Sequence, residues 1–396
     1  MEAGPIGTRI RELRGKVLTQ KQLADSAGVS VDLIRKLEQG SRQTTTIASL
    51  QKLARALDVE VGELVSHPAS LPSVDPEAGV VAIRRALTPI DDLIGEDIFD
   101  AEALTLQEAS RTVDYAWGAY WNGRYELLGS VLPTALSQLR ATAHAVSAED
   151  RARAHELLAR IYWVTGCSLV HLGHADPAYL AIRQALQAAN EGNDPLLDAT
   201  LRGSVGWQLL VQGRYKESEA VVMRAAASIE PRGDALPQEL STYGSLVLQG
   251  ATAAGRDHRS AQAQDFVATA AEIADRVGSD RRDYETYFGP SQVVMQTVDV
   301  NVVTENYTQA ISAAKRMPAE PNLPLASRAR HLADRALAHA NLGQSQKALD
   351  ILLTAERIGP DWIKHQSLPR QIVSSLLDND RQAPLRSLAR RLGVHD

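Results

Sequence analysis

Apolar residues recur at intervals of three and four along most of the chain, the spacing that places them on one face of an α-helix. Alternating apolar and polar runs between hairpin turns are almost absent. The helical pattern stops at Ser66–Pro76, where three prolines stand among small polar residues. Since 396 residues exceed the usual size of a single core, we predict an all-α protein with two domains. Residues 1–66 and 82–396 form the domains, and residues 67–81 form a linker.

Two short helices joined by a tight turn are predicted between Leu18 and Gly40. Ala24 is small where the helices would cross, and Gly28 suits a left-handed turn. The apolar residues of the motif would face one shared core: Leu23, Val29, Ile34 and Leu37. A preceding helix carries Ile6, Ile10 and Leu13, and a following one carries Leu50, Leu53, Ala54 and Leu57. With a last helix over Val59–Leu64, the pattern predicts a five-helix domain.

The pattern Gln-x-x-Leu-Ala, Gly-Val-Ser and Leu-Glu-x-Gly within this segment resembles the phage-repressor-like XRE family of helix-turn-helix domains over residues 6–66. The resemblance implies DNA binding, with the second helix of the motif entering the major groove by its N-terminus. It also implies a pairing of Arg14 with Glu38, across a connection, Arg14–Val17, that is tighter than usual in this family.

The same resemblance assigns contacts with DNA to two sets of residues. Base edges would be read by Ser30, Val31, Asp32, Arg35 and Lys36, and phosphates would be bound by Gln20, Ser41, Arg42 and Gln43. Arginine and lysine donate to guanine, aspartate accepts from cytosine, and valine contacts a thymine methyl group. The alternative for Asp32 is that it only caps the start of its helix.

Charge is distributed unevenly between the two domains. Residues 1–66 hold 10 Lys and Arg against 8 Asp and Glu, whereas the whole chain holds 42 against 48. The N-terminal domain is therefore the basic part, but only mildly. Because phosphate neutralisation supplies most non-specific affinity, one such domain should bind DNA weakly. We therefore expect a homodimer on a two-fold symmetric operator.

A degenerate helix-turn-helix unit recurs after the linker, with turns at Gly123, Gly173, Gly213 and Gly343. The copies around Gly123 and Tyr307 are weaker, and a further helix pair is predicted over Gln238–Val277. Small residues before and after each turn would let helices approach closely. The unit resembles the tetratricopeptide repeat (TPR), which implies a C-terminal α-solenoid of diverged TPR-like helix pairs. The apolar stripe of Leu368–Val394 suggests a cap on this solenoid, with dimerisation as the alternative.

The repeat resemblance places several aromatic and polar residues on the concave face, where they would form a ligand groove. These are Trp117, Tyr120, Arg160, Trp163, His171, Trp207, Gln292, Asp299 and Arg330. The alternative is that the tryptophans belong to the ordinary core between repeats.

The whole layout is similar to the peptide-sensing quorum regulators of Gram-positive bacteria and to helix-turn-helix repeat regulators of actinomycetes. We therefore expect a sequence-specific transcription regulator whose repeat domain senses a peptide or small molecule and dimerises. The alternative is an adaptor whose repeats dock a partner protein, with the N-terminal domain localising or dimerising it. No phosphate-binding glycine loop, His-Glu-x-x-His pair or Gly-x-Ser-x-Gly elbow is present, so an enzyme is not expected.

Cofactors, metals and membranes are not expected either. The lone Cys167 has no second cysteine with which to form a disulfide or a zinc site, and a buried, inert thiol is predicted. No secretory signal or run of about eighteen apolar residues occurs. These features predict a cytoplasmic protein, associated with the nucleoid when it is bound to DNA.

Overall fold

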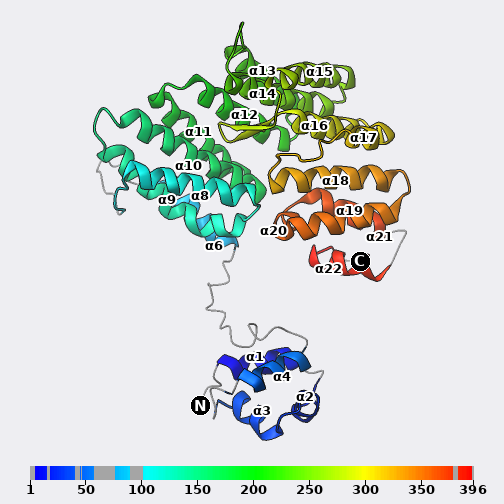
Figure 1. The fold of residues 1–396 in the computed structure, drawn as a ribbon. Helices are drawn as coiled ribbons and strands as arrows, with labels where there is room; N and C mark the ends of the chain where they lie inside the picture. Colours follow the sequence, from blue (N-terminus) through cyan, green and yellow to red (C-terminus); the bar gives the residue numbers. More distant parts are fainter. Residues whose placement is uncertain are drawn as a thin grey trace. The chain divides into compact units, whose positions relative to one another are not determined.

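The computed structural model describes residues 5–15, 18–40, 45, 47–57, 76–89, 101–377 and 382–394. The chain divides into two compact units, Met1–Asp75 and Pro76–Asp396. Both units are helical, which confirms the predicted fold class (Figure 1). The first helix of the second unit begins at Pro76, inside the predicted linker, so the boundary lies earlier in the chain than the sequence indicated. In the described ranges, no helix is both long and apolar enough to span a membrane.

The first unit contains the four described helices α1 (Pro5–Arg14), α2 (Gln20–Ala27), α3 (Val31–Glu38) and α4 (Ile47–Ala56). Ile10, Leu23, Ile34, Leu37 and Leu53 are fully buried in its core, as the apolar pattern predicted. Gly28 has φ 59°, so a side chain there would be strained, and this turn lets α3 follow α2 after two further residues. The fifth helix predicted over Val59–Leu64 lies outside the described residues.

The second unit begins with α6 (Pro76–Leu87) and continues as antiparallel helix pairs that stand side by side (Figure 1). The pairs are α8 (Leu106–Trp121) with α9 (Tyr125–Ala145), α10 (Arg151–His171) with α11 (Ala175–Gly192), α12 (Pro195–Val211) with α13 (Tyr215–Ser228), α14 (Pro237–Arg256) with α15 (Ser260–Val277), α16 (Pro290–Val303) with α17 (Tyr307–Ala314), and α18 (Leu325–Asn341) with α19 (Ser345–Ile358). Every repeat copy identified from the sequence coincides with one of these pairs.

The turns inside the pairs require a left-handed residue after the first helix. Glycine supplies it in four pairs, with φ between 70° and 85° at Gly123, Gly173, Gly213 and Gly343. In the other two pairs, His258 and Glu305 adopt φ of 59° and 62°. The lack of glycine at those two turns explains why their repeat signal was weak in the sequence.

Two pairs have a glycine at the point where their helices approach most closely. A Cβ atom on Gly206 of α12 would lie 2.2 Å from Cγ1 of Val222 on α13. One on Gly166 of α10 would lie 2.8 Å from Ile182 on α11. Both contacts are closer than real Cβ atoms tolerate, so glycine is needed for these crossings, as the repeat pattern predicted.

The C-terminal helices α20 (Pro360–Lys364), α21 (Ser367–Leu377) and α22 (Ala383–Arg391) cap the last pair. The apolar residues of the predicted cap are buried inside this chain: Ile372, Val373, Leu376, Leu377, Leu385, Leu388 and Leu392. Their burial favours the cap over the dimerisation alternative for this stripe. Trp362 of α20 also contacts Gly123 at the first turn, so the end of the solenoid returns to its beginning (Figure 1).

A short β-hairpin, which the sequence analysis did not predict, connects α15 to α16. It pairs β1 (Arg281–Asp283) with β2 (Thr286–Phe288), and Phe288 packs against Gly244 of α14. The two turn residues, Tyr284 and Glu285, both have positive φ, 44° and 55°. This left-handed conformation is unfavourable for residues other than glycine, asparagine and aspartate, so the backbone of the turn is strained.

We predict that Gly206→Ala lowers the free energy of unfolding of the repeat unit by about 1–3 kcal/mol, because the new methyl group overpacks the contact with Val222. Gly118→Ala in α8 is the matched control, since a Cβ there has no heavy atom within 4 Å. The control should instead gain about 0.5–1 kcal/mol from reduced backbone freedom. Denaturation followed by tryptophan fluorescence measures both, and equal effects of the two substitutions would contradict the packing argument.

Candidate DNA-reading surface and ligand pockets

The position of α3 is fixed by its buried face and by its N-terminal cap. Ile34 and Leu37 are fully buried, and Gly7 of α1 lies so close to the carbonyl of Leu37 that a Cβ atom would not fit. The Ser30 hydroxyl accepts a hydrogen bond from the Leu33 amide at 3.2 Å, which satisfies one free N–H at the helix start. Ser30, rather than Asp32, is therefore the capping residue.

The opposite face of α3 carries the predicted base-reading side chains to solvent. Val31 is 39% exposed, which is unusual for a large apolar residue in this chain. Asp32, Arg35 and Lys36 have side chains about half exposed. Because Arg35 and Lys36 of the last turn follow Asp32 of the first by three and four residues, the three side chains form one surface along the helix.

Asp32 lies between the two cations of this surface. Its carboxylate accepts from Arg35 Nη2 at 2.5 Å and pairs with Lys36 Nζ at 2.7 Å. The hydrogen bonds from Lys36 and Arg35 hold the pKa of Asp32 below its usual value, so the carboxylate stays ionised at neutral pH. The surface therefore offers donors and an acceptor together, as base recognition requires.

Glu38, at the end of α3, ties the helices of this unit together. Arg14 donates to its two carboxylate oxygens from Nε at 2.9 Å and Nη2 at 3.1 Å, as the family resemblance implied. Gln20 Nε2 donates to Oε2 at 2.7 Å. Burial alone would raise the pKa of Glu38, but the hydrogen bonds from Arg14 and Gln20 outweigh it and lower the pKa.

The predicted phosphate contacts are placed only in part. Gln20 is the first residue of α2, but its side-chain amide is engaged by Glu38. A contact from its side chain to DNA would have to share or replace that bond. Ser41, Arg42 and Gln43 lie outside the described residues.

The predicted aromatic groove is partly a core. Trp117 and Tyr120 are buried, with the Trp117 ring 4.8 Å from that of Trp163. His171 is enclosed by Tyr120, Tyr125 and Trp207, and burial lowers its pKa to about 3. These side chains pack between repeats, the alternative that the sequence left open. Cys167 in the same region is buried, as predicted, and burial raises the pKa of its thiol to about 12.

Trp163 and Arg160 border a cavity of about 500 Å³, here called the hairpin pocket. Its wall includes Asp114, Asp194, Leu197, Tyr284 and Glu285. Glu285, at the strained turn, is buried and forms ion pairs with Arg160 and with Arg282. Arg160 also bonds Asp114 at 3.2 Å. The tip of the hairpin thus closes one side of the pocket with a carboxylate.

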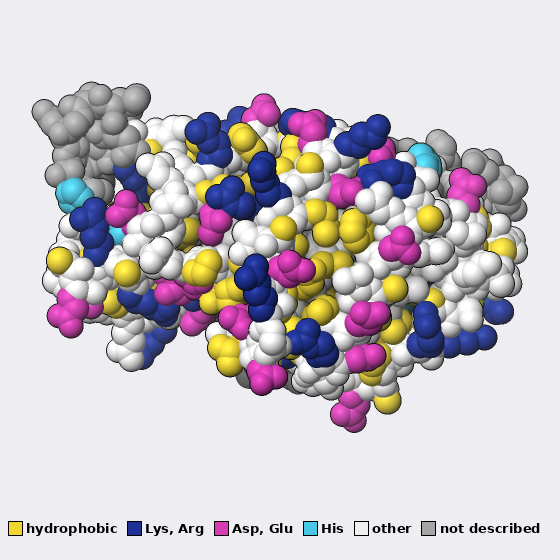
Figure 2. Space-filling view, turned by 90° about the horizontal axis from the view of Figure 1, so that it is seen from above, with side chains coloured by type: hydrophobic (Ala, Val, Ile, Leu, Met, Phe, Trp, Pro, Cys, Tyr) yellow, Lys and Arg dark blue, Asp and Glu magenta, His cyan; other side chains and the backbone are white. Residues whose placement is uncertain are grey.

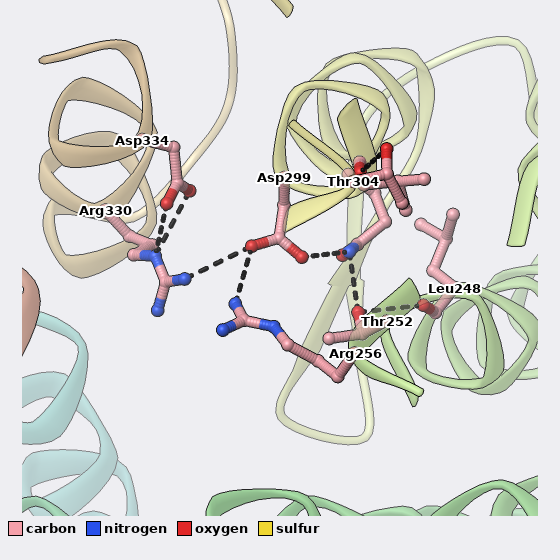
Figure 3. Close-up of polar contacts among 9 residues, drawn as sticks. Leu248, Thr252, Arg256, Asp299, Thr304, Arg330 and Asp334 are labelled. Carbon is pink, nitrogen blue, oxygen red and sulfur yellow. Dashed lines mark hydrogen bonds and ion pairs between the residues drawn. The ribbon is translucent and has the colours of Figure 1, made fainter. Parts of the chain in front are cut away.

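Three other predicted groove residues, Trp207, Asp299 and Arg330, border a second cavity of about 230 Å³, here called the arginine pocket. Arg256 and Arg330 both donate to Asp299 Oδ1, at 3.0 and 3.2 Å (Figure 3). Gln292 borders neither pocket, although its side-chain oxygen is buried and finds no hydrogen-bond partner within the described parts. The predicted groove is therefore two separate pockets beside an aromatic core.

Several pocket residues lie on elements that have little signal in the sequence. Gln249 and Arg256 lie on α14, whose repeat lacked the glycine signal. Tyr284 and Glu285 lie in the hairpin, whose turn lacks the Asn-Gly or Asp-Gly pair that marks such turns.

On the face of the molecule drawn in Figure 2, basic and acidic side chains are interspersed with hydrophobic ones. Among the described side chains of that face, no broad basic area stands out.

The comparison with protein families agrees with the geometry of the first unit. Residues 10–64 match the family model described as helix-turn-helix. The N-terminal unit is therefore a helix-turn-helix domain of the XRE type. No curated protein sequence matches the chain.

Three solved structures are similar to the chain at low sequence identity. PlcR of Bacillus thuringiensis, in complex with the peptide PapR7 and DNA, is 13% identical, with 79% of this chain and 95% of that chain covered and a TM-score of 0.38. The pilF protein of Pseudomonas aeruginosa is 15% identical, with 65% of this chain and 96% of that chain covered and a TM-score of 0.33. ComR of Streptococcus suis is 12% identical, with 90% of this chain and 96% of that chain covered and a TM-score of 0.23.

We predict that Glu38→Gln lowers the stability of the N-terminal unit by about 2–3 kcal/mol, because a buried ion pair with Arg14 is lost. All five tryptophans lie after residue 116, so circular dichroism should show an early melting step that tryptophan fluorescence does not. Asp32→Asn, which breaks an exposed pair, is the control and should melt like the wild type.

The same pair predicts a pH dependence. Because the pKa of Glu38 is lowered in the folded state, its contribution is present above the ordinary carboxyl pKa and is lost as the pH falls through the folded pKa. The difference between wild type and Glu38→Gln should therefore shrink in acid. A difference that stays constant below pH ~4 would contradict the ion-pair account.

Proposed function

We propose that the protein is a sequence-specific DNA-binding transcription regulator that acts as a homodimer. The observation that carries this proposal is the exposed face of α3, where Val31, Arg35 and Lys36 stand clear of a buried core that holds the helix rigidly. A rigid helix with a mixed donor, acceptor and apolar face is what major-groove reading requires. The helix-turn-helix match over residues 10–64 supports the same role.

Dimerisation is proposed from the weakness of one domain. The N-terminal residues carry only a slight excess of basic side chains, and Asp32 offsets part of the charge of Arg35 and Lys36. Two copies on a two-fold operator double both the phosphate contacts and the bases read.

The repeat domain is proposed to sense a peptide or a small molecule. The support is that two cavities lie among its helices, each with charged side chains beside an aromatic one, Trp163 in the hairpin pocket and Trp207 in the arginine pocket. A ligand alters DNA binding only if it prefers one arrangement of the dimer. Effector control therefore requires that binding in the repeats change the population of such arrangements.

Lys36→Ala is expected to weaken binding to the operator by about 1–3 kcal/mol and to relax its specificity. Binding would be measured on the chain's own upstream DNA and on genomic fragments at fixed salt. Lys347→Ala, an exposed lysine of the repeat domain, is the charge-matched control and should bind like the wild type. Absence of any discrete site for the wild-type protein would refute the proposal and favour the adaptor alternative.

Asp32→Asn should act in the opposite direction on DNA of random sequence. It removes the carboxylate that pairs with Arg35 and Lys36, so the surface meets phosphates with one more net positive charge. Non-specific affinity should rise and its decrease with salt should steepen, while the preference for the operator falls. An unchanged salt dependence would show that α3 does not face DNA.

A further inference from the structure

The arginine pocket has an apolar side and a charged side. Trp207 and Leu210 of α12 and Met295 of α16 form the apolar side. Arg256 of α14, Asp299 of α16 and Arg330 of α18 form the charged side (Figure 3). A molecule bound there would contact four helices from different repeats.

Both carboxylates of the pocket already accept hydrogen bonds from arginine. Asp299 accepts from both arginines through Oδ1 and from Gln296 Nε2 at 3.0 Å through Oδ2. Asp334, which is buried, accepts from Arg330 Nε at 3.0 and 3.1 Å through its two oxygens. Both carboxylates are thus already paired with arginine, so a cationic ligand would have to compete with Arg256 and Arg330 for them.

The guanidinium groups, in contrast, keep unused donors. Each has five N–H groups, of which Asp299 and Asp334 take only a part. Figure 3 shows one terminal nitrogen of Arg256 and one of Arg330 that carry no dashed line, both on the side of the guanidinium groups turned away from Asp299. Two arginines that are held together by Asp299 and keep such donors match the two oxygens of a carboxylate.

Two buried polar atoms of the lining also have no hydrogen-bond partner among the described residues. They are Arg256 Nε, a donor, and Gln249 Oε1, an acceptor. A buried polar atom without a partner costs free energy, so each is best explained by a group supplied from outside. The missing groups are an acceptor next to Arg256 and a donor next to Gln249.

We propose that the arginine pocket binds a carboxylate that lies beside an N–H donor and an apolar side chain. This is the chemistry of an N-acylated apolar amino acid, either free or as the C-terminal residue of a peptide. The carboxylate accepts from Arg256 and Arg330, the N–H donates to Gln249 Oε1, and the side chain contacts Trp207, Leu210 and Met295. As an effector site the pocket rests on the proposed function; as a binding site it rests on these contacts.

The test is calorimetry on the full chain with N-acetyl-L-leucine and with its uncharged amide. The acid should bind, and the amide should bind at least about tenfold more weakly, because it cannot form charge-assisted bonds to both arginines. An acetylated pentapeptide that ends in leucine distinguishes the two sources. Tighter binding of the peptide identifies a peptide terminus, and exclusion of the peptide identifies a free acid. The proposal is overturned if neither N-acetyl-L-leucine nor the peptide binds, or if N-acetyl-L-leucine and its amide bind equally well.

Two variants and one control locate the site. Arg256→Gln should weaken binding of N-acetyl-L-leucine about tenfold. Gln249→Met, which keeps the side-chain volume but removes the acceptor, should weaken this binding severalfold. Arg259→Gln is the control, because Arg259 has the same 33% side-chain exposure but pairs with Glu219 and Asp257 outside the pocket. If Arg259→Gln weakens binding of N-acetyl-L-leucine as much as Arg256→Gln does, the acid does not bind in the arginine pocket.

Calorimetry without DNA separates this proposal from the proposed function. If the protein binds the acid but no operator, the pocket proposal holds and the proposed function is refuted. If it binds an operator but neither N-acetyl-L-leucine nor the peptide, the proposed function holds and the pocket proposal is refuted.

Discussion

Close approach between helices at residues without side chains is the constraint on which the repeat domain depends. Gly166 and Gly206 let the helices of two pairs cross at distances that alanine would not permit. At Gly123, the first turn accepts Trp362 from the last helices, so the two ends of the solenoid share one core. A solenoid closed in this way holds α12, α14, α16 and α18 around the arginine pocket without a continuous sheet or a disulfide.

Local features were readable from the sequence because single residues determine them. Gly28 and Ser30 specify the turn and cap of the reading helix, and glycines mark four of the repeat turns. The pairing of Arg14 with Glu38 followed from the resemblance rather than from spacing, and the structure confirms it. Helix positions in both units were therefore predictable.

Long-range features were not readable. Periodicity indicates which side of a helix a tryptophan occupies, but not whether another helix covers it, so Trp117 in the core and Trp207 at a pocket gave the same signal. The hairpin has strands of three residues and no glycine in its turn, and only contacts across the fold hold Glu285 against Arg160. The return of Trp362 to Gly123 joins segments with no sequence pattern in common.

The central claim is that the exposed face of α3 reads bases. The most direct measurement is selection of bound DNA from a random pool by the full-length wild type and by Arg35→Ala, followed by sequencing. The account predicts a two-fold symmetric motif for the wild type and a loss of preference at the same few positions of each half-site in the variant. A wild-type pool without a motif, or an identical motif from both proteins, would contradict it.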